Sequence, residues 1–334
     1  LDEIVLRAGD STGPRSRWPI TVAAGLVLVA GLAATAVLLA DRSPEAPSDE
    51  PAATTAASTS SSSVAPVPPV ETVAPALTFE FSVDAGLTIG QIDERLAASV
   101  DTIDAGDFSS AARSAAFDSD FTADRTLLPE GLMAPGTYVV PAEATATDMA
   151  TVMVERMNEI GEQVDIVTRG AALGRTPNEI LTIASIIEKE ANVPGDRGRI
   201  SRVIHNRLFT TDTTGEPFPL QVDSSVLYGR DQADIDPSLP FSELRQIPTG
   251  WNTYVIPGLP ATPIAAPSIE SIEAALSPAP NPRPSDPICV DLPEPSQCFL
   301  FFYVLGDDDG SMAFAATGEQ HEANVERAGQ LGLL

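Results

Sequence analysis

An uncharged run of 21 residues, 20–40, most constrains how this 334-residue chain can fold. As an α-helix rising about 1.5 Å per residue, it would span roughly 30 Å, the thickness of the hydrocarbon core of a membrane. Arg15 and Arg17 precede it, which predicts that residues 1–19 form a cytoplasmic tail and that the rest lies outside the cytoplasm. A cleaved signal peptide is the alternative, but its apolar core is usually shorter. We therefore expect a single-pass membrane anchor.

The segment after this run, residues 41–76, is rich in Pro, Ser, Thr and Ala and contains no aromatic residue. A segment of this composition cannot bury enough apolar surface to fold, so it predicts a disordered linker. Residues 77–334 are then the folded part, and they are long enough for a substantial core.

Charge and composition exclude several classes of function. The chain carries 19 Lys and Arg residues against 47 Asp and Glu residues, a net charge of −28. A nucleic-acid-binding function is excluded because it depends on cationic contacts with phosphate. Two histidines and two cysteines leave little room for a zinc or iron–sulfur centre, so we expect neither a metal nor another cofactor.

The two cysteines, Cys289 and Cys298, enclose a short proline-rich segment. In a domain outside the cytoplasm this arrangement favours a structural disulfide. A catalytic cysteine is the alternative, but neither residue stands in a local signature of that chemistry.

Hydrophobic periodicity predicts a mixture of strands and helices, that is, an α+β fold. The expected strands are residues 77–83 and 136–140, and a C-terminal hairpin of residues 299–305 and 311–315. The expected helices are residues 87–98, 147–160, 176–192 and 199–209.

The helix expected at residues 176–192 has a well-defined start. Thr176 and Glu179 have the spacing of a capping box, and Pro177 would occupy the first helical position. At about 100° per residue, Ile183 and Glu190 then fall on the same apolar face. The helical phase therefore turns one carboxylate in the direction of the isoleucines.

Glu190 is costly to place on that face unless it is paired or protonated. Desolvation would raise its pKa and make it a candidate general acid near neutral pH. The alternative is a glutamate at the edge of the apolar stripe that reaches water or pairs with an arginine. Glu188 and Lys189 point away from the stripe, and we expect Glu188 to be solvated.

Several ordered motifs resemble those of one family. They are EGLMAPGTY at 130–138, LTIASIIEKE at 181–190, RVIHNRL at 202–208, LQVDSSVLYG at 220–229, NTYVIPGLPATP at 252–263, AALSPA at 274–279 and HEANV at 321–325. In this order and spacing they resemble the endolytic murein transglycosylase family, the YceG-like proteins. The resemblance implies a small LysM-like α/β subdomain at 77–128 and a mixed α+β catalytic domain at 129–334.

The same resemblance implies a lytic transglycosylase of the cell (inner) membrane. Such an enzyme cleaves the β-1,4 bond between MurNAc and GlcNAc in nascent peptidoglycan strands, leaves 1,6-anhydroMurNAc ends and terminates glycan polymerisation. Glycan strands are the implied substrate, and cell-wall synthases of the elongation or division machinery are the implied partners. The catalytic acid of the family falls on the second glutamate of E-K-E, Glu190.

Other polar residues of the motifs are candidates for contacts with the sugar. Their amide, carboxylate and hydroxyl groups suit sugar hydroxyls and acetamides, although each could instead brace a loop. They are Gln221, Asp223, Asn252 and Tyr254 and, with less weight, Asn206 and Arg207.

The chain departs from the family pattern at several places. Ala191 follows E-K-E where Thr or Ser is usual, and Val222 and Ser224 stand where Ser and Pro are usual. Ala261 and Thr262 replace a Pro-Gly pair, and an insertion at about 281–297 carries Cys289. These departures motivate a second hypothesis, a non-catalytic, membrane-anchored scaffold that binds peptidoglycan.

Overall fold

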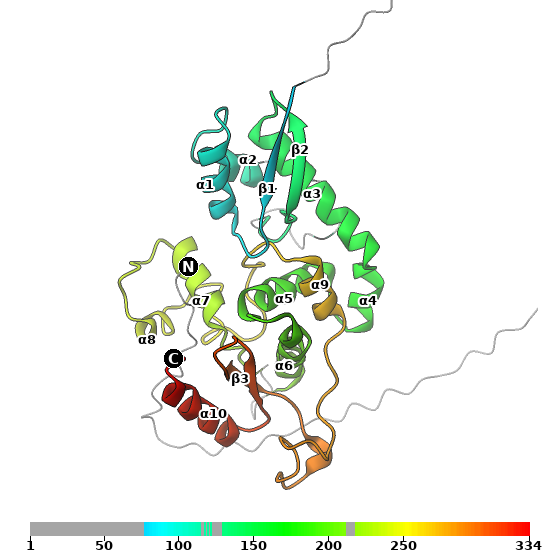
Figure 1. Ribbon diagram of the computed structural model, residues 1–334, viewed down its shortest axis with the longest axis vertical. Helices are drawn as coiled ribbons and strands as arrows, with labels where there is room; N and C mark the ends of the chain where they lie inside the picture. Colours follow the sequence, from blue (N-terminus) through cyan, green and yellow to red (C-terminus); the bar gives the residue numbers. More distant parts are fainter. Residues whose placement is uncertain (1–76, 115–116, 118, 120, 122–128, 212–217) are drawn as a thin grey trace, which may run out of the picture. The chain divides into compact units, whose positions relative to one another are not determined.

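The computed structural model describes residues 77–114, 117, 119, 121, 129–211 and 218–334. The predicted tail, anchor and linker, residues 1–76, lie outside this part of the chain. Within the described ranges, no helix combines the length and the apolar character needed to cross a bilayer. Figure 1 shows helices together with short two-stranded sheets, so the predicted α+β class is confirmed.

The N-terminal module is built on the sheet of β1 (Thr78–Val83) and β2 (Gly136–Pro141). The two strands are antiparallel and place Phe81 opposite Tyr138. Three helices accompany the sheet: α1 (Ile89–Ser99), α2 (Asp107–Ser114) and α3 (Ala146–Gln163). Strand β1 lies in the expected LysM-like subdomain, 77–128, whereas β2 lies in the expected catalytic domain, 129–334. The sheet therefore joins these two segments.

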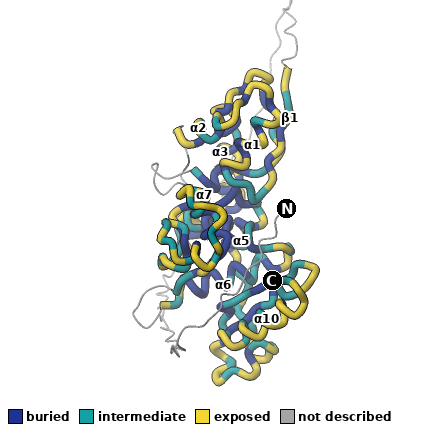
Figure 2. Tube along the Cα trace, turned by 90° about the vertical axis from the view of Figure 1, so that its left-hand side faces the viewer, coloured by how far each residue is buried: buried dark blue, intermediate teal, exposed yellow. Residues whose placement is uncertain are grey.

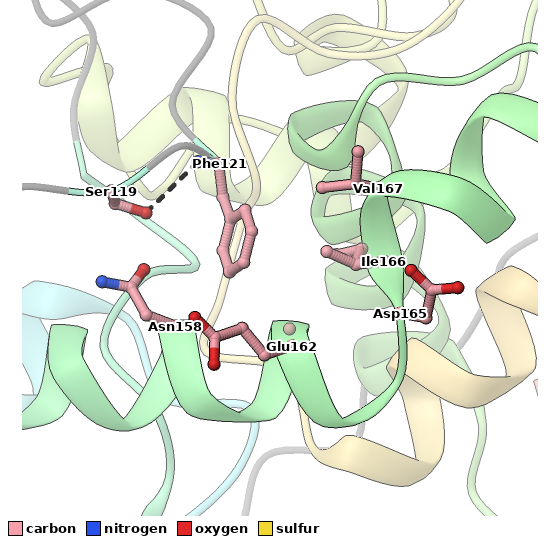
Figure 3. Close-up of a pocket in the computed structure, with 8 residues that line it drawn as sticks. Ser119, Phe121, Asn158, Glu162, Asp165, Ile166 and Val167 are labelled. Carbon is pink, nitrogen blue, oxygen red and sulfur yellow. Dashed lines mark hydrogen bonds between the residues drawn. The ribbon is translucent and has the colours of Figure 1, made fainter. Parts of the chain in front are cut away.

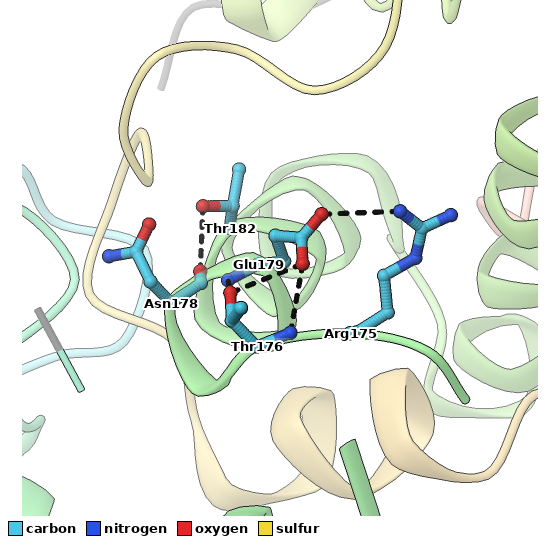
Figure 4. Close-up of polar contacts among 5 residues, drawn as sticks. All are labelled: Arg175, Thr176, Asn178, Glu179 and Thr182. Atoms are coloured by element: carbon cyan, nitrogen blue, oxygen red, sulfur yellow. Dashed lines mark hydrogen bonds and ion pairs between the residues drawn. The ribbon is translucent and has the colours of Figure 1, made fainter. Parts of the chain in front are cut away.

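The central helix is α5 (Pro177–Glu190), which follows the short α4 (Ile166–Ala172). Its start is the predicted capping box, drawn in Figure 4: Thr176 Oγ1 accepts from the Glu179 N–H at 3.2 Å, and the Glu179 carboxylate accepts from the Thr176 N–H at 2.8 Å. Arg175 adds an ion pair to Glu179 at 3.2 Å. These bonds satisfy N–H groups that no preceding turn can satisfy, and so they fix where the helix begins.

Helices surround α5 on several sides. It contacts α4, α6 (Arg197–Phe209), α7 (Asp223–Gln232) and α9 (Ile269–Leu276). Every residue from Ile180 to Ile187 is buried, including those outside the predicted stripe, and Figure 2 colours this helix as mostly buried. The sequence pattern therefore predicted one buried face, whereas most faces of this helix are buried.

The C-terminal part contains the predicted hairpin. Strands β3 (Phe302–Leu305) and β4 (Met312–Ala315) pair antiparallel, and α10 (Gly318–Leu331) packs on them. The remaining short elements are α8 (Phe241–Leu244) and two 3₁₀ turns at Pro194–Asp196 and Pro295–Gln297.

The insertion before the hairpin is fixed by a disulfide within it and by a hydrogen bond from α10. Cys289 and Cys298 form a disulfide and are buried against Ala316. Gln320 of α10 donates from Nε2 to the carbonyl of Ile288 at 2.7 Å. The inserted loop is therefore packed onto the C-terminal hairpin and helix.

The residues after position 128 approach the loop at 260–266 very closely. Gly131 has φ +85°, and a Cβ atom at this position would lie 2.5 Å from Cβ of Pro263. Glycine is required at this position for two reasons: the backbone is left-handed, and no side chain fits.

We expect Gly131→Ala to lower the free energy of unfolding by about 3 kcal/mol, since backbone strain and overpacking add. Gly174→Ala is the matched control: Gly174 also has a positive φ, +68°, but a Cβ atom added there would meet nothing within 4 Å. It should cost only about 1 kcal/mol. Urea unfolding of both variants measures the difference, and equal losses would show that the contact with Pro263 has no energetic weight.

Candidate active site

The candidate site is centred on Glu190, the last residue of α5. Its side chain is buried, at 4% exposure, on the apolar side of the helix as predicted. Ser224 Oγ donates to Oε1 at 2.7 Å, and the Tyr303 hydroxyl donates to Oε2 at 3.2 Å. Each carboxylate oxygen thus has its own hydroxyl donor, one from α7 and one from β3.

The electrostatics of Glu190 combine two opposing effects. Burial raises its pKa above the usual range, because desolvation disfavours the charged form. Hydrogen bonds from Ser224, including its backbone N–H in the first turn of α7, and from Tyr303 act in the other direction. The site therefore favours a protonated carboxyl and also has donors ready for the anion.

The three residues of E-K-E point to three different parts of the protein. Glu188 accepts from the backbone N–H of Ser268 at 3.0 Å and from its hydroxyl, just ahead of α9. Lys189 donates to the carbonyl of Gly86 in the turn between β1 and α1 at 3.3 Å. The expectation of a solvated Glu188 is wrong, because the side of α5 opposite the isoleucines also packs against protein.

A second buried acid, Asp223, lies at the start of α7 and is 3% exposed. The hydroxyl of Tyr254 donates to its Oδ1 at 2.5 Å. The pKa of Asp223 is raised to about 7. Burial is the main cause; the bond from Tyr254 and the charge of Arg245 act to lower the pKa, and the charge of Glu190 acts to raise it. Two carboxyl groups with raised pKa values therefore interact electrostatically.

The segment that carries Asp223 and Ser224 is fixed by the loop that carries Tyr254. The Val222 N–H donates to Thr253 Oγ1 at 2.9 Å, and the Gln221 N–H donates to the Thr253 carbonyl at 3.0 Å. Gln221 has φ +53°, a conformation that non-glycine residues seldom adopt, and its side chain is exposed beside the buried acids.

Asn252 and Asn206, both predicted to contact sugar, use their amides inside the protein. The Nδ2 of Asn252 donates to the carbonyls of Leu244 and Ile247 at 3.1 and 2.8 Å. The Nδ2 of Asn206 donates to Asn281 and to the Leu300 carbonyl, both at 2.8 Å. The first residue braces the loop at 244–254, and the second braces the base of the insertion.

Arg207 ties together the two segments that hold Glu190. It is buried on α6, and its guanidinium donates to the carbonyl of Phe301 at 2.7 Å and to that of Leu220 at 2.5 Å. These carbonyls precede Tyr303 and Ser224 in the chain. One side chain therefore sets the distance between the two backbones whose hydroxyls reach Glu190.

Ser224 and Tyr303 were not among the predicted site residues, and Arg207 was predicted only as a sugar contact of lower weight. Ser224 and Arg207 stand inside motifs that were already noted, next to a candidate acid and a candidate amide. Tyr303 offered a weaker signal, a single polar aromatic residue within an apolar strand that otherwise reads as core.

Two cavities of the described part lie elsewhere. One, of about 530 Å³, lies along α3 and α4 and has Phe121, Asn158 and Asp165 among its lining residues (Figure 3). The other, of about 490 Å³, lies between the ends of β1 and β2 and the start of α9. Glu190 lines neither of these two cavities. Buried acids with raised pKa values identify the candidate site.

The arrangement suits acid–base chemistry by a single carboxyl group. A protonated Glu190 can donate a proton, and the resulting anion is received by two hydroxyl donors and by the positive end of α7. Asp223 offers a second titrating group beside it.

Comparison with known proteins finds curated relatives that share one name. The chain is similar to the endolytic murein transglycosylases of Streptococcus pneumoniae serotype 2 (strain D39), 28% identical over 200 residues, and of Bacillus subtilis (strain 168), 29% identical over 199 residues. Each match covers 59% of this chain, but only 31% and 47% of those relatives. The chain thus spans less than half the length of the curated relatives it matches.

A solved structure and a family model extend the match. The crystal structure of a YceG-like protein from Listeria monocytogenes superimposes with a TM-score of 0.58 at 26% identity and covers 76% of this chain and 77% of that one. The model of the YceG-like family matches residues 70–327, from the end of the predicted linker through most of α10. The chain that carries the buried, hydroxyl-bonded Glu190 therefore belongs to the YceG-like family.

Proposed function

We propose that this protein is an endolytic lytic transglycosylase of peptidoglycan, with Glu190 as its catalytic acid and base. The observation that carries the proposal is the buried carboxyl at the end of α5, whose pKa burial raises and whose two oxygens accept from Ser224 and Tyr303. Membership of the YceG-like family and relatives named endolytic murein transglycosylase support it.

In the proposed mechanism, Glu190 first protonates the oxygen that links C1 of MurNAc to the next sugar, and the glycosidic bond breaks. The Glu190 carboxylate then takes the proton of the MurNAc C6 hydroxyl as that oxygen bonds to C1. The products are a 1,6-anhydroMurNAc end and a new GlcNAc end, and no water is consumed. Glu190 ends as it began, protonated, so a single carboxyl group completes the cycle.

The neighbouring residues have supporting roles in this proposal. Ser224 and Tyr303 stabilise the carboxylate between the two proton transfers, because each donates to one of its oxygens. Gln221, exposed beside the acids, and Tyr254, half-buried on Asp223, are the residues that we assign to sugar contacts. Binding depends on hydrogen bonds and stacking, because an acidic chain does not attract a substrate that also carries carboxylates.

The proposed location follows from the sequence. Residues 20–40 anchor the chain in the membrane and residues 41–76 extend the catalytic part away from it, outside the cytoplasm. Nascent glycan strands and the synthases that make them are the proposed substrate and partners there.

Glu190→Gln is expected to lower turnover of uncrosslinked glycan strands by about 10³-fold, because general acid–base catalysis by one group contributes on this order. The amide removes a buried titrating carboxyl without changing its volume, so the melting temperature should stay the same or rise. Mass spectrometry of the products of the full chain and of the variant measures both the rate and the anhydro ends.

Three results would contradict this proposal in different ways. Retained activity in Glu190→Gln would remove Glu190 from the chemistry. Products with reducing ends and no anhydro ring would indicate hydrolysis, with Asp223 as the base that activates water. Glycan binding by the wild-type protein with no turnover would support a non-catalytic scaffold.

The pH dependence of kcat/KM should follow the protonation of the Glu190–Asp223 pair. A general acid works only while it is protonated, so the rate should be flat on the acid side and fall as the pH rises through the raised apparent pKa of the pair. Asp223→Asn removes the negative charge beside Glu190. Because a negative charge on Asp223 disfavours ionisation of Glu190 beside it, the falling limb should move to lower pH in this variant.

A stopped assay over pH 5 to 9 on both proteins measures this shift. Tyr254→Phe is the companion variant: it keeps the Asp223 carboxyl and removes the hydrogen bond that lowers its pKa, so Asp223 stays neutral to higher pH and the limb should also move to lower pH, by less than in Asp223→Asn. Identical profiles in all three proteins would exclude electrostatic coupling of the two acids during turnover.

A further inference from the structure

A third buried carboxyl, Glu130, lies outside the site and bridges two parts of the protein. It is 4% exposed. Its Oε1 accepts from the backbone N–H of Ile89, the first residue of α1, at 3.0 Å. Its Oε2 accepts from the hydroxyl of Tyr228 on α7, also at 3.0 Å. One carboxylate thus joins the N-terminal module to the helix that begins with Asp223 and Ser224.

The position of Tyr228 on α7 relates it to the site. Tyr228 follows Ser224 by four residues, and residues at this spacing lie on the same face of a helix, one turn apart. The face of α7 that presents a hydroxyl to Glu130 is therefore the face that presents a hydroxyl to Glu190. A bond at Tyr228 fixes the rotation of α7 about its axis, and the direction of Ser224 depends on that rotation.

The backbone that carries Glu130 is itself fixed relative to α5. Gly131 lies against Pro263 with no room for a side chain. The next residue of that loop, Ile264, donates its N–H to Ser185 Oγ on α5 at 3.0 Å. Contacts therefore run from α5 through the loop to Glu130, then through Tyr228 and α7 back to Glu190 at the end of α5.

We propose that Glu130 is a positioning residue that, through Tyr228, sets the rotation of α7 and so holds Ser224 against Glu190. This inference rests on the proposed function for its kinetic consequence, and on the structure alone for its effect on α7. The N-terminal module, which supplies the other bond to Glu130, thereby takes part in ordering the catalytic site.

Tyr228→Phe is the sharpest test, because it removes the hydroxyl that reaches Glu130 and Thr262 and keeps the ring. In the full chain we expect kcat on uncrosslinked glycan to fall about tenfold and KM to change less than twofold, since the misplaced group acts on the chemical step. We also expect faster hydrogen exchange of the α7 amides. Glu130→Gln should lower kcat by a similar factor. The double variant should have a kcat no lower than that of the less active single variant, because both substitutions act on the same interaction.

Tyr138→Phe is the matched control. The hydroxyl of Tyr138 donates to the carbonyl of Ala134 at 2.6 Å, so its partner lies within the N-terminal module and not on α7. This variant should keep kcat within twofold and leave the exchange of α7 unchanged, even where the melting temperature falls.

The readouts separate this inference from the proposed function. Equal losses of kcat in Tyr228→Phe and Tyr138→Phe, or unchanged exchange of α7 in Tyr228→Phe, would overturn the positioning role. If the wild-type protein has no turnover, the proposed function fails, and the exchange of α7 alone decides whether Glu130 positions that helix.

Discussion

The structure depends on one constraint: a carboxyl group is buried at the end of the central helix. Burial of an acid is expensive unless hydrogen-bond donors reach it, and both donors to Glu190 come from distant parts of the chain, 34 and 113 residues away. Their segments must then be fixed by other contacts. Thr253 fixes the backbone ahead of α7, and Arg207 binds the carbonyls that precede both donors.

Local rules were sufficient for the parts of the fold that local interactions determine. The capping box predicted the start of α5, and the helical phase predicted the burial of Glu190, because both depend on residues within a few positions of each other. The hairpin at β3 and β4 was predictable for the same reason. Helix α7 was not, because it begins with a run of buried residues and lacks the 3.6-residue alternation that marks an amphipathic helix.

Two outcomes depended on surroundings that local sequence rules do not describe. A helical wheel assumes that the side opposite the core faces water, and Glu188 was expected to be solvated on that assumption; α5 is instead enclosed, and Glu188 binds Ser268. Asn252 belongs to a motif that suits sugar binding, but its amide is taken by the carbonyls of its own loop. Two of the departures from the family pattern also have local functions: Ser224 donates to Glu190, and Thr262 accepts from Trp251 Nε1 at 2.9 Å.

The three consecutive residues of E-K-E also limit how this protein can change. Glu188, Lys189 and Glu190 are committed to α9, to the turn after β1 and to the candidate site. One residue inserted into or deleted from α5 would rotate all three side chains by about 100° relative to the capped start of the helix. A substitution in α5 alters the contacts of one side chain, which a change elsewhere can compensate. A change in the length of α5 breaks the hydrogen bonds of all three residues together. Length variation among related chains should therefore collect in the connecting loops and be absent from this helix.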